Sequence, residues 1–301
     1  MKAIRVTSFN SPYEIQTIPV PSPTSLVPHG LLVKIVVASY CHTDGMVSSG
    51  IFNTSLPCTA SHEGSDTVVA VGSASASPDF DFKVGGRVMC GLPLHPCGSC
   101  FYCTSAPETF RQYVRTAVAS KVMSGLMLMG ALRMPHRRLE LGGRLGHLGI
   151  QMAKALGLRV IGIDARDEGL ELMKSSGADV VLDARRGQED VVKEANDAAN
   201  EGEGVDATLN LSDADSAAGL ACAVTKMHGT VVQIAQPDEV KIPSQELVVF
   251  RDVRVRGSLL CSREESVGLR EHVAKNGITL KTNVFHGLDS WALLSLCIRG
   301  R

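Results

Sequence analysis

Side chains that bind metals gather at three places in the amino-terminal part of the sequence. Cys41 and His42 are adjacent, and His62 and Glu63 follow about twenty residues later. Further along, cysteines recur at every third position, at Cys97, Cys100 and Cys103. A single buried cysteine or histidine usually packs in a core, but thiolates, imidazoles and carboxylates together are the donors that bind zinc. The ordered set therefore predicts metal chemistry, and three close cysteines suit metal thiolates better than secreted disulfides.

A glycine-rich run from Gly142 to Gly149 opens a helical stretch, and the strand that follows ends at Asp164. Amides at the start of a helix bind a pyrophosphate, and a carboxylate at the end of the next strand binds ribose hydroxyls. The pattern therefore predicts a dinucleotide site, with NAD preferred over NADP because the carboxylate repels a 2′-phosphate. The residues expected at this site are Gly143, Leu145, Gly146 and Asp164.

Taken in order, these motifs resemble those of the zinc-containing alcohol dehydrogenases, which belong to the medium-chain dehydrogenase/reductase superfamily. The corresponding stretches here read Cys41-His42-Thr43-Asp44, Ser61-His62-Glu63-Gly64 and Cys97-Gly98-Ser99-Cys100. The resemblance covers residues 1–113 and about 141–300. It implies reversible hydride transfer between NAD and a small primary or secondary alcohol, with an aldehyde or ketone as the other partner.

The stretch Val232-Gln233-Ile234-Ala235 is similar to the family as well, and this resemblance adds Ile234 to the residues expected at the cofactor site. The resemblance also implies a role for each of the motif residues. Cys41 and His62 would bind the catalytic zinc, and Glu63 would lie behind the metal or bind it. Thr43 would accept the proton of the alcohol and pass it toward the cofactor ribose and His42. Zinc in such a site acts as a Lewis acid that favours the alkoxide at neutral pH.

Two cysteines of the family pattern are missing. A catalytic zinc in this family has two cysteines and one histidine, yet no cysteine occurs between Cys103 and Cys222. Glu63 is the nearby group that could fill the gap, but it would crowd the position of the alcohol oxygen. We therefore expect weak zinc binding at Cys41 and His62, and very low alcohol oxidation or none.

The cysteines from Cys97 to Cys103 resemble the structural zinc lobe of the family, without its fourth cysteine. His95 or Glu108 could substitute as the fourth ligand. A three-thiolate site completed by water, or no stable site, remains an alternative. An iron–sulfur cluster would need a cysteine where Pro107 stands, which makes it the least favoured interpretation.

The order of helices and strands predicts an α/β chain with two domains. Short apolar runs broken by Pro and Gly indicate a β-rich, barrel-like first domain; the resemblance makes it GroES-like, over residues 1–113, with 276–301 returning to it. Helices and strands then alternate over 139–275, which predicts a doubly wound parallel sheet of the Rossmann type. The expected strands are 31–39, 67–71, 87–89, 159–163, 207–211 and 230–234, and the expected helices 145–156, 191–199, 214–224 and 262–275.

Residues 114–138 fit neither domain. They combine methionines with a basic cluster from Arg133 to Arg138, and we interpret them as an atypical linker or a replaced segment. The strand before the glycine run should be central and apolar, but residues 135–141 are largely charged, and burial of unpaired charge is costly. Leu141 and Arg144 also stand where glycines are expected. We predict that 114–138 is the least well packed part of the chain.

The composition favours small-molecule ligands. The formal net charge is −1, from 30 basic and 31 acidic residues, so no strong field would attract nucleic acid or an anionic membrane. No apolar run approaches the roughly 20 residues that span a bilayer, and a signal-peptide pattern is absent; we expect a cytoplasmic protein, compatible with a homo-oligomer. Two alternatives are a non-catalytic relative that keeps the partial fold, and a cysteine-based redox or zinc-storage module, which leaves the carboxyl-terminal half unexplained.

Overall fold

The computed structural model describes residues 1–28, 30–39, 42–59, 64–73, 76–77, 80–90, 139–140, 143–199, 202–258, 263–281 and 286–288. The expectations for 114–138, and those for the side chains of Cys41, His62, Glu63, Cys97, Cys100 and Cys103, lie outside this part of the chain. Two compact units divide it: an amino-terminal unit, with the described residues up to 90 and 286–288, and a second unit with those from 139 to 281. Within these ranges no helix is long and apolar enough to cross a membrane.

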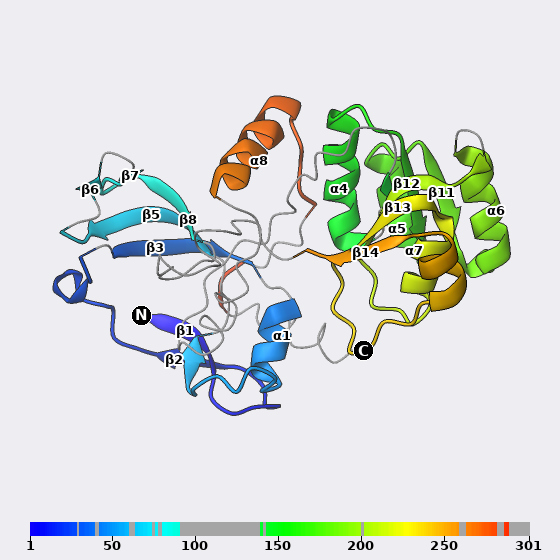
Figure 1. The fold of residues 1–301 in the computed structure, drawn as a ribbon. Coiled ribbons are helices and arrows are strands. Elements are labelled where there is room, and N and C mark those ends of the chain that lie inside the picture. The colour runs from blue at the N-terminus through cyan, green and yellow to red at the C-terminus, as the bar shows by residue number, and fades with distance from the viewer. Residues whose placement is uncertain are drawn as a thin grey trace. The chain divides into compact units, whose positions relative to one another are not determined.

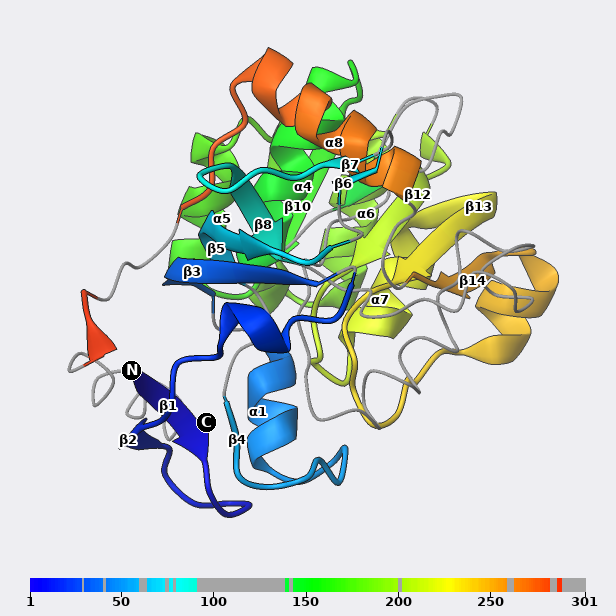
Figure 2. The same ribbon diagram turned by 90° about the vertical axis from the view of Figure 1, so that its left-hand side faces the viewer.

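Small antiparallel sheets make up most of the amino-terminal unit, as its alternating apolar runs predict. One sheet has the order β2 (Glu14–Thr17), β1 (Lys2–Val6), β4 (Cys58–Thr59). A second, visible in Figure 2, has the order β3 (Leu31–Ala38), β5 (Gly64–Val71), β8 (Arg87–Cys90). A two-stranded ribbon joins β6 (Ala76–Ser77) and β7 (Phe80–Asp81), and the unit also holds the short helices η1 (Pro23–Ser25) and α1 (His42–Ser48).

A glycine is required where β5 ends. A Cβ atom on Gly72 would overlap the carbonyl oxygen of Val27 and approach that of Pro28 to 2.6 Å. The backbone N–H of Gly72 donates to the carbonyl oxygen of Gly30 at 2.8 Å, so the end of β5 lies directly against the turn that precedes β3. Only a residue without a side chain permits this approach.

A six-stranded parallel sheet forms the second unit. Its strands lie in the order β11 (Val180–Asp183), β10 (Val160–Asp164), β9 (Leu139–Glu140), β12 (Val205–Asn210), β13 (Thr225–Gln233), β14 (Arg254–Gly257). Counted along the chain, this is the order 3-2-1-4-5-6 of a Rossmann fold, and it reverses between β9 and β12. The predicted doubly wound sheet is confirmed, and we call this part the Rossmann unit.

Helices cover both faces of the sheet (Figure 1). They are α4 (Gly143–Ala155), α5 (Asp167–Ser175), α6 (Gln188–Ala198) and α7 (Ala217–Val224). The helix α8 (Arg263–Asn276) lies beside α4, and the unit also holds the shorter η2 (Ala184–Arg186) and the π-helix η4 (Ser244–Phe250). Ile150 of α4 and Met173 of α5 pack in one core cluster with Val160, and Val191 of α6 packs in another with Ile161. Consecutive residues of β10 thus face opposite helix layers, as the period of a strand requires.

The predicted elements of this unit agree with the observed ones except at their ends. The helix expected to begin at residue 214 begins at Ala217, and the strand expected to begin at 230 begins at Thr225. The second expectation was wrong because the register shifts between Val205 and Ala207 of β12, so β13 passes an irregularity that breaks period-two alternation. The strand before the glycine run does lie at the centre of the sheet, between β10 and β12, over Leu139 and Glu140.

Candidate dinucleotide-binding site

The carboxyl ends of the parallel strands meet at one edge of the sheet, and polar residues stand there. β10 ends at Asp164, β12 at Asn210 and β13 at Gln233, while α4 begins at Gly143, directly after β9. Ligands of open α/β sheets bind outside this edge, where the strand order reverses. In this chain the reversal falls between β9 and β12, so the start of α4 lies at the expected position for a ligand.

The first turn of α4 can bind an anion. The first four amides of a helix have no partner within it, and the helix dipole places positive charge there. Gly146 and Gly149 are buried, and Ile150 is fully buried in the core beneath them. Small residues on this side allow α4 to pack close to the sheet, with its amino end at the switch point. This arrangement fits the pyrophosphate of a dinucleotide.

Asp164 lies on the α5 side of the strand end. The alternation along β10 directs it there, because Gly162, two residues earlier, packs against Met173 of α5. A Cβ atom on Gly169 of α5 would overlap the Asp164 carboxylate, so this glycine makes room for the acidic side chain. The Asp164 side chain is only 7% exposed.

Arg166 binds the Asp164 carboxylate on its other side. Asp164 Oδ1 accepts hydrogen bonds from the backbone N–H and the Nε of Arg166, both at 3.0 Å, and Oδ2 accepts one from Nη2 at 2.9 Å. Burial opposes ionisation of Asp164, but the hydrogen bonds and the charge of Arg166 outweigh it and lower the pKa of the carboxyl. Asp164 is therefore charged at neutral pH and already paired.

Asn210 and Gln233 organise the loop that carries Ile234. Asn210 Nδ2 donates to Gln233 Oε1 at 2.8 Å, and Gln233 Nε2 donates to the carbonyl oxygen of Ala235 at 2.8 Å. The carbonyl oxygen of Asn210 accepts from the backbone N–H groups of Ile234 and Ala235, at 3.0 and 3.1 Å. Ile234 is partly buried against the core cluster of Ile150. These contacts fix the chain immediately beyond β13, next to the switch point.

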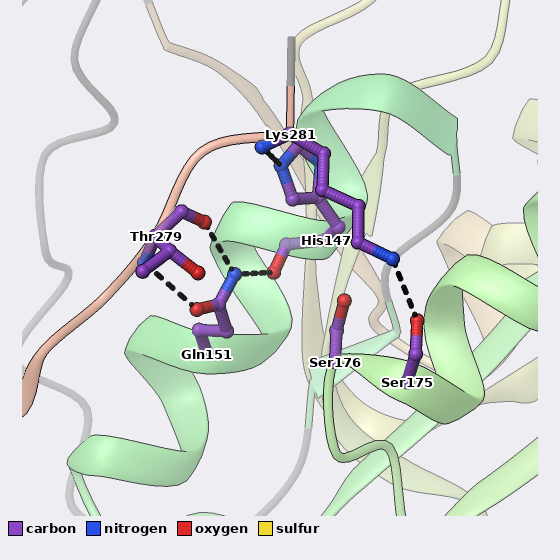
Figure 3. Close-up of a pocket in the computed structure, with 6 residues that line it drawn as sticks. All are labelled: His147, Gln151, Ser175, Ser176, Thr279 and Lys281. Carbon is purple, nitrogen blue, oxygen red and sulfur yellow. Dashed lines mark hydrogen bonds between the residues drawn. The ribbon is translucent and has the colours of Figure 1, made fainter.

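A small pocket of about 140 Å³ lies beside α4 (Figure 3), lined by His147, Gln151, Ser175, Ser176, Thr279 and Lys281. Gln151 Nε2 donates to the carbonyl oxygen of Thr279 at 2.9 Å, and Gln151 Oε1 accepts from its N–H at 3.0 Å. The backbone N–H of Lys281 donates to His147 Nε2 at 3.2 Å. The polar groups that line the pocket hydrogen-bond to one another, and these hydrogen bonds connect the segment after α8, at Thr279 and Lys281, to α4.

The residues expected at the cofactor site come together at the same edge of the sheet. Gly143, Leu145 and Gly146 lie in the first turns of α4, Asp164 ends β10, and Ile234 follows β13. Arg166, Gly169, Asn210 and Gln233 were not expected there. For Arg166 a signal existed in the spacing Asp-x-Arg at a strand end; the amide network of Asn210 and Gln233 has no such signal.

The amino-terminal unit shows only part of the expected catalytic set. His42 begins α1, Thr43 follows it and is partly buried, and Asp44 is buried. The backbone carbonyl of Asp44 accepts a hydrogen bond from the Tyr13 hydroxyl at 3.1 Å, which anchors the start of the helix. No group of three or more His, Cys, Asp or Glu side chains positioned to hold a metal occurs among the residues that the structure describes.

Comparison with known proteins places both units in one class of enzyme. Residues 27–134 match the family model of the alcohol dehydrogenase GroES-like domain, and residues 145–275 match that of the zinc-binding dehydrogenases. An alcohol dehydrogenase of Geobacillus stearothermophilus is 30% identical over 307 residues, which cover 88% of this chain and 86% of that protein. One from Schizosaccharomyces pombe is 30% identical over 285 residues, covering 81% and 79%.

Solved structures share the fold. An alcohol dehydrogenase from Aeropyrum pernix has a TM-score of 0.76 at 20% identity, covering 100% of this chain and 97% of that one. A zinc-binding dehydrogenase from Sinorhizobium meliloti with NADP bound has a TM-score of 0.72 at 23% identity, covering 93% and 90%. Fold and matched domains define a dehydrogenase of two domains, one GroES-like and one Rossmann. The chain belongs to the zinc-containing alcohol dehydrogenase family of oxidoreductases.

Proposed function

We propose that this chain is an NAD-binding oxidoreductase of small primary or secondary alcohols and of the matching aldehydes or ketones. The observation that carries the proposal is the carboxyl edge of the Rossmann sheet, where the start of α4 and Asp164 flank the switch point. The amides of α4 would bind the pyrophosphate, with Gly143, Leu145 and Gly146 in contact with it. Asp164 would bind the ribose hydroxyls, and Ile234 would pack against the nicotinamide half.

Thr43 would handle the proton of the reaction. Oxidation of an alcohol removes a hydride from carbon, which passes to the nicotinamide ring, and a proton from oxygen. The Thr43 hydroxyl would accept that proton and pass it through the cofactor ribose toward His42. A hydroxyl both accepts and donates a hydrogen bond, so it can relay a proton without carrying charge.

Zinc, when bound in this family, stabilises negative charge on the alcohol oxygen. The donor set here does not fit a tight catalytic site, because the sequence supplies Cys41, His62 and Glu63 but no cysteine between Cys103 and Cys222. The same deficit supports a second candidate function, that of a relative that binds the dinucleotide but turns over alcohol very slowly or not at all.

Alcohol-dependent NADH formation, followed at 340 nm with and without added zinc, tests the proposal. We expect slow turnover that depends on zinc and that the Thr43→Val variant abolishes, since valine keeps the shape of threonine without its hydroxyl. NADH binding without any turnover over a panel of small alcohols would favour the second candidate. Absence of NADH binding altogether would refute both.

A further inference from the structure

The carboxylate at the cofactor site is paired with a cation. Arg166 presents its Nε and Nη2 to the two oxygens of Asp164, at 3.0 and 2.9 Å, and its backbone N–H adds a third hydrogen bond. The Asp164 side chain is 7% exposed and the Arg166 side chain 58%. A ligand arriving at the end of β10 therefore meets a guanidinium as well as a carboxylate.

This pairing changes the basis for cofactor choice. A carboxylate excludes NADP because its charge repels the 2′-phosphate, whereas an arginine near the same position accommodates that phosphate. Arginine has five N–H donors in a planar fork, and two of its nitrogens face Asp164. The exposed remainder can hydrogen-bond to a phosphate while the carboxylate stays neutralised.

We propose that Arg166 gives the cofactor site affinity for both NAD and NADP, with Asp164 binding the ribose hydroxyls of NAD and Arg166 the 2′-phosphate of NADP. The inference rests on the proposed function of the Rossmann unit as a dinucleotide-binding unit. It replaces the strict NAD preference that Asp164 alone predicts.

Neighbouring acidic residues limit the affinity for NADP, so that it is comparable to the affinity for NAD and does not exceed it. Asp167, the first residue of α5, shares Arg185 with Asp183, so only part of its charge is compensated. Glu168 and Asp213 stabilise the charged form of Arg166 and raise its pKa further, after the larger effect of Asp164. Their negative charge also opposes a bound phosphate. The site is therefore expected to accept NADP without preferring it.

The end of the next strand supplies a matched control. Asp183 ends β11 and pairs with Arg185 in the same way: Oδ1 accepts from the backbone N–H and Nε of Arg185 at 2.9 Å, and Oδ2 accepts from Nη2 at 2.7 Å. Both turns read Asp-Ala-Arg, and Asp164 and Asp183 are paired in the sheet. Arg185 lies one strand farther from the switch point, and its loss acts on the cofactor only through the freed charge of Asp167, which is 85% exposed and screened by water, so the effect should be small.

Titration calorimetry of NADH and NADPH with the full chain tests the inference. We expect dissociation constants within about tenfold of each other for the unaltered protein. Arg166→Met should weaken NADPH binding by roughly tenfold to a hundredfold, the worth of one charge-assisted hydrogen bond, and leave NADH within about threefold. Arg166→Lys should retain part of the NADPH affinity, and Arg185→Met should leave both constants within about threefold.

The possible results distinguish a failure of the proposed function from a failure of the role assigned to Arg166. If neither dinucleotide binds, the proposed function fails. If NADH binds and NADPH is weaker by a hundredfold or more, Asp164 acts alone and the role of Arg166 is refuted. Equal loss of NADPH affinity in Arg166→Met and Arg185→Met would refute it too, because the effect would then be one of general charge.

Discussion

Single acidic residues of the Rossmann unit are held in their charged form by identifiable partners. Asp179 accepts hydrogen bonds from Lys154 Nζ at 2.7 and 2.8 Å and from the backbone N–H of Val160 at 2.7 Å. Burial opposes its ionisation, but these contacts outweigh burial and lower the pKa of the carboxyl. Because folding lowers this pKa, the ionised carboxylate stabilises the folded protein at pH values above the unfolded-state pKa of about 3.9. This stabilisation is lost as the pH falls through the folded-state pKa.

Replacement of Asp179 by asparagine should therefore make the stability of the protein depend less on pH in the acidic range. The amide oxygen can still accept from Val160, but the charge is gone. We expect the urea midpoint of the unaltered protein to fall more steeply between about pH 5 and pH 2 than that of Asp179→Asn. Parallel profiles for the two proteins would show that Lys154 does not hold the carboxyl charged.

A second residue-scale prediction concerns His228, which has a left-handed backbone with φ of 61°. Its Nδ1 lies 2.9 Å from Asp252 Oδ2, with both side chains exposed, and such surface pairs contribute about 0–1 kcal/mol. The left-handed conformation costs a residue with a side chain about 1–2 kcal/mol. His228→Gly should thus be more stable to urea than His228→Ala by about 1 kcal/mol, since both lose the imidazole and only glycine loses the strain. Equal stability would contradict this.

The placement of Asp164 could be predicted from sequence, whereas the spacing Asp-x-Arg allows its pairing with Arg166 but does not fix it. In a Rossmann fold the acidic residue ends the strand that follows the glycine run and its helix, so its distance along the chain from the glycine run is set by the fold. A long arginine side chain has many rotamers, so its partner depends on packing around Gly169 and on the exposure of the strand end. These are three-dimensional properties.

Two glycines on helices of the Rossmann unit should respond in opposite ways to alanine. A methyl group on Gly169 of α5 would overlap the Asp164 carboxylate, whereas nothing lies within 4 Å of the equivalent position on Gly268 of α8. We expect Gly268→Ala to stabilise by roughly 0.5–1 kcal/mol, and Gly169→Ala to destabilise by about 1–3 kcal/mol and to weaken NADH binding. Chemical denaturation with NADH titration measures both, and a stabilised Gly169→Ala would contradict the close packing.

The link between α4 and the segment after α8 can be tested separately. Gln151 makes two hydrogen bonds to the backbone of Thr279, so Gln151→Leu should cost about 1–3 kcal/mol and speed amide exchange at Thr279. Lys281→Met is the control, since it removes only the bond from Nζ to Ser175 and keeps the backbone bond to His147. Unchanged exchange in Gln151→Leu would mean that other contacts hold the segment.

Sequence patterns predicted β10, β12 and β13 because buried parallel strands are apolar runs, but they did not predict β11, β14 or α5. β10, with the sequence VIGID, is buried at four of its five residues, and its pattern is unmistakable. β9 could be placed only by topology, since residues 135–141 lack the apolar character of a central strand. The early start of β13 escaped prediction because an irregularity in pairing leaves no periodic signal.

The whole molecule combines a Rossmann unit with an amino-terminal unit, and its sequence lacks two of the cysteines that bind zinc in the family pattern. We expect zinc at Cys41 and His62 to be removed by a mild chelator, since one thiolate and one imidazole are fewer strong donors than the family site has. The NADH dissociation constant should not change on chelation. Stoichiometric zinc that resists chelation, measured by atomic absorption together with rapid alcohol turnover, would contradict this expectation.

Hydrogen–deuterium exchange of the full chain with and without NADH tests the central claim, that the carboxyl edge of the Rossmann sheet binds the dinucleotide, most directly. The structure leads us to expect slower exchange on binding at 143–149, at 164–169 and at 233–236, with little change at the opposite end of the sheet around His228. Protection absent from these three segments, with NADH nevertheless bound, would contradict the account.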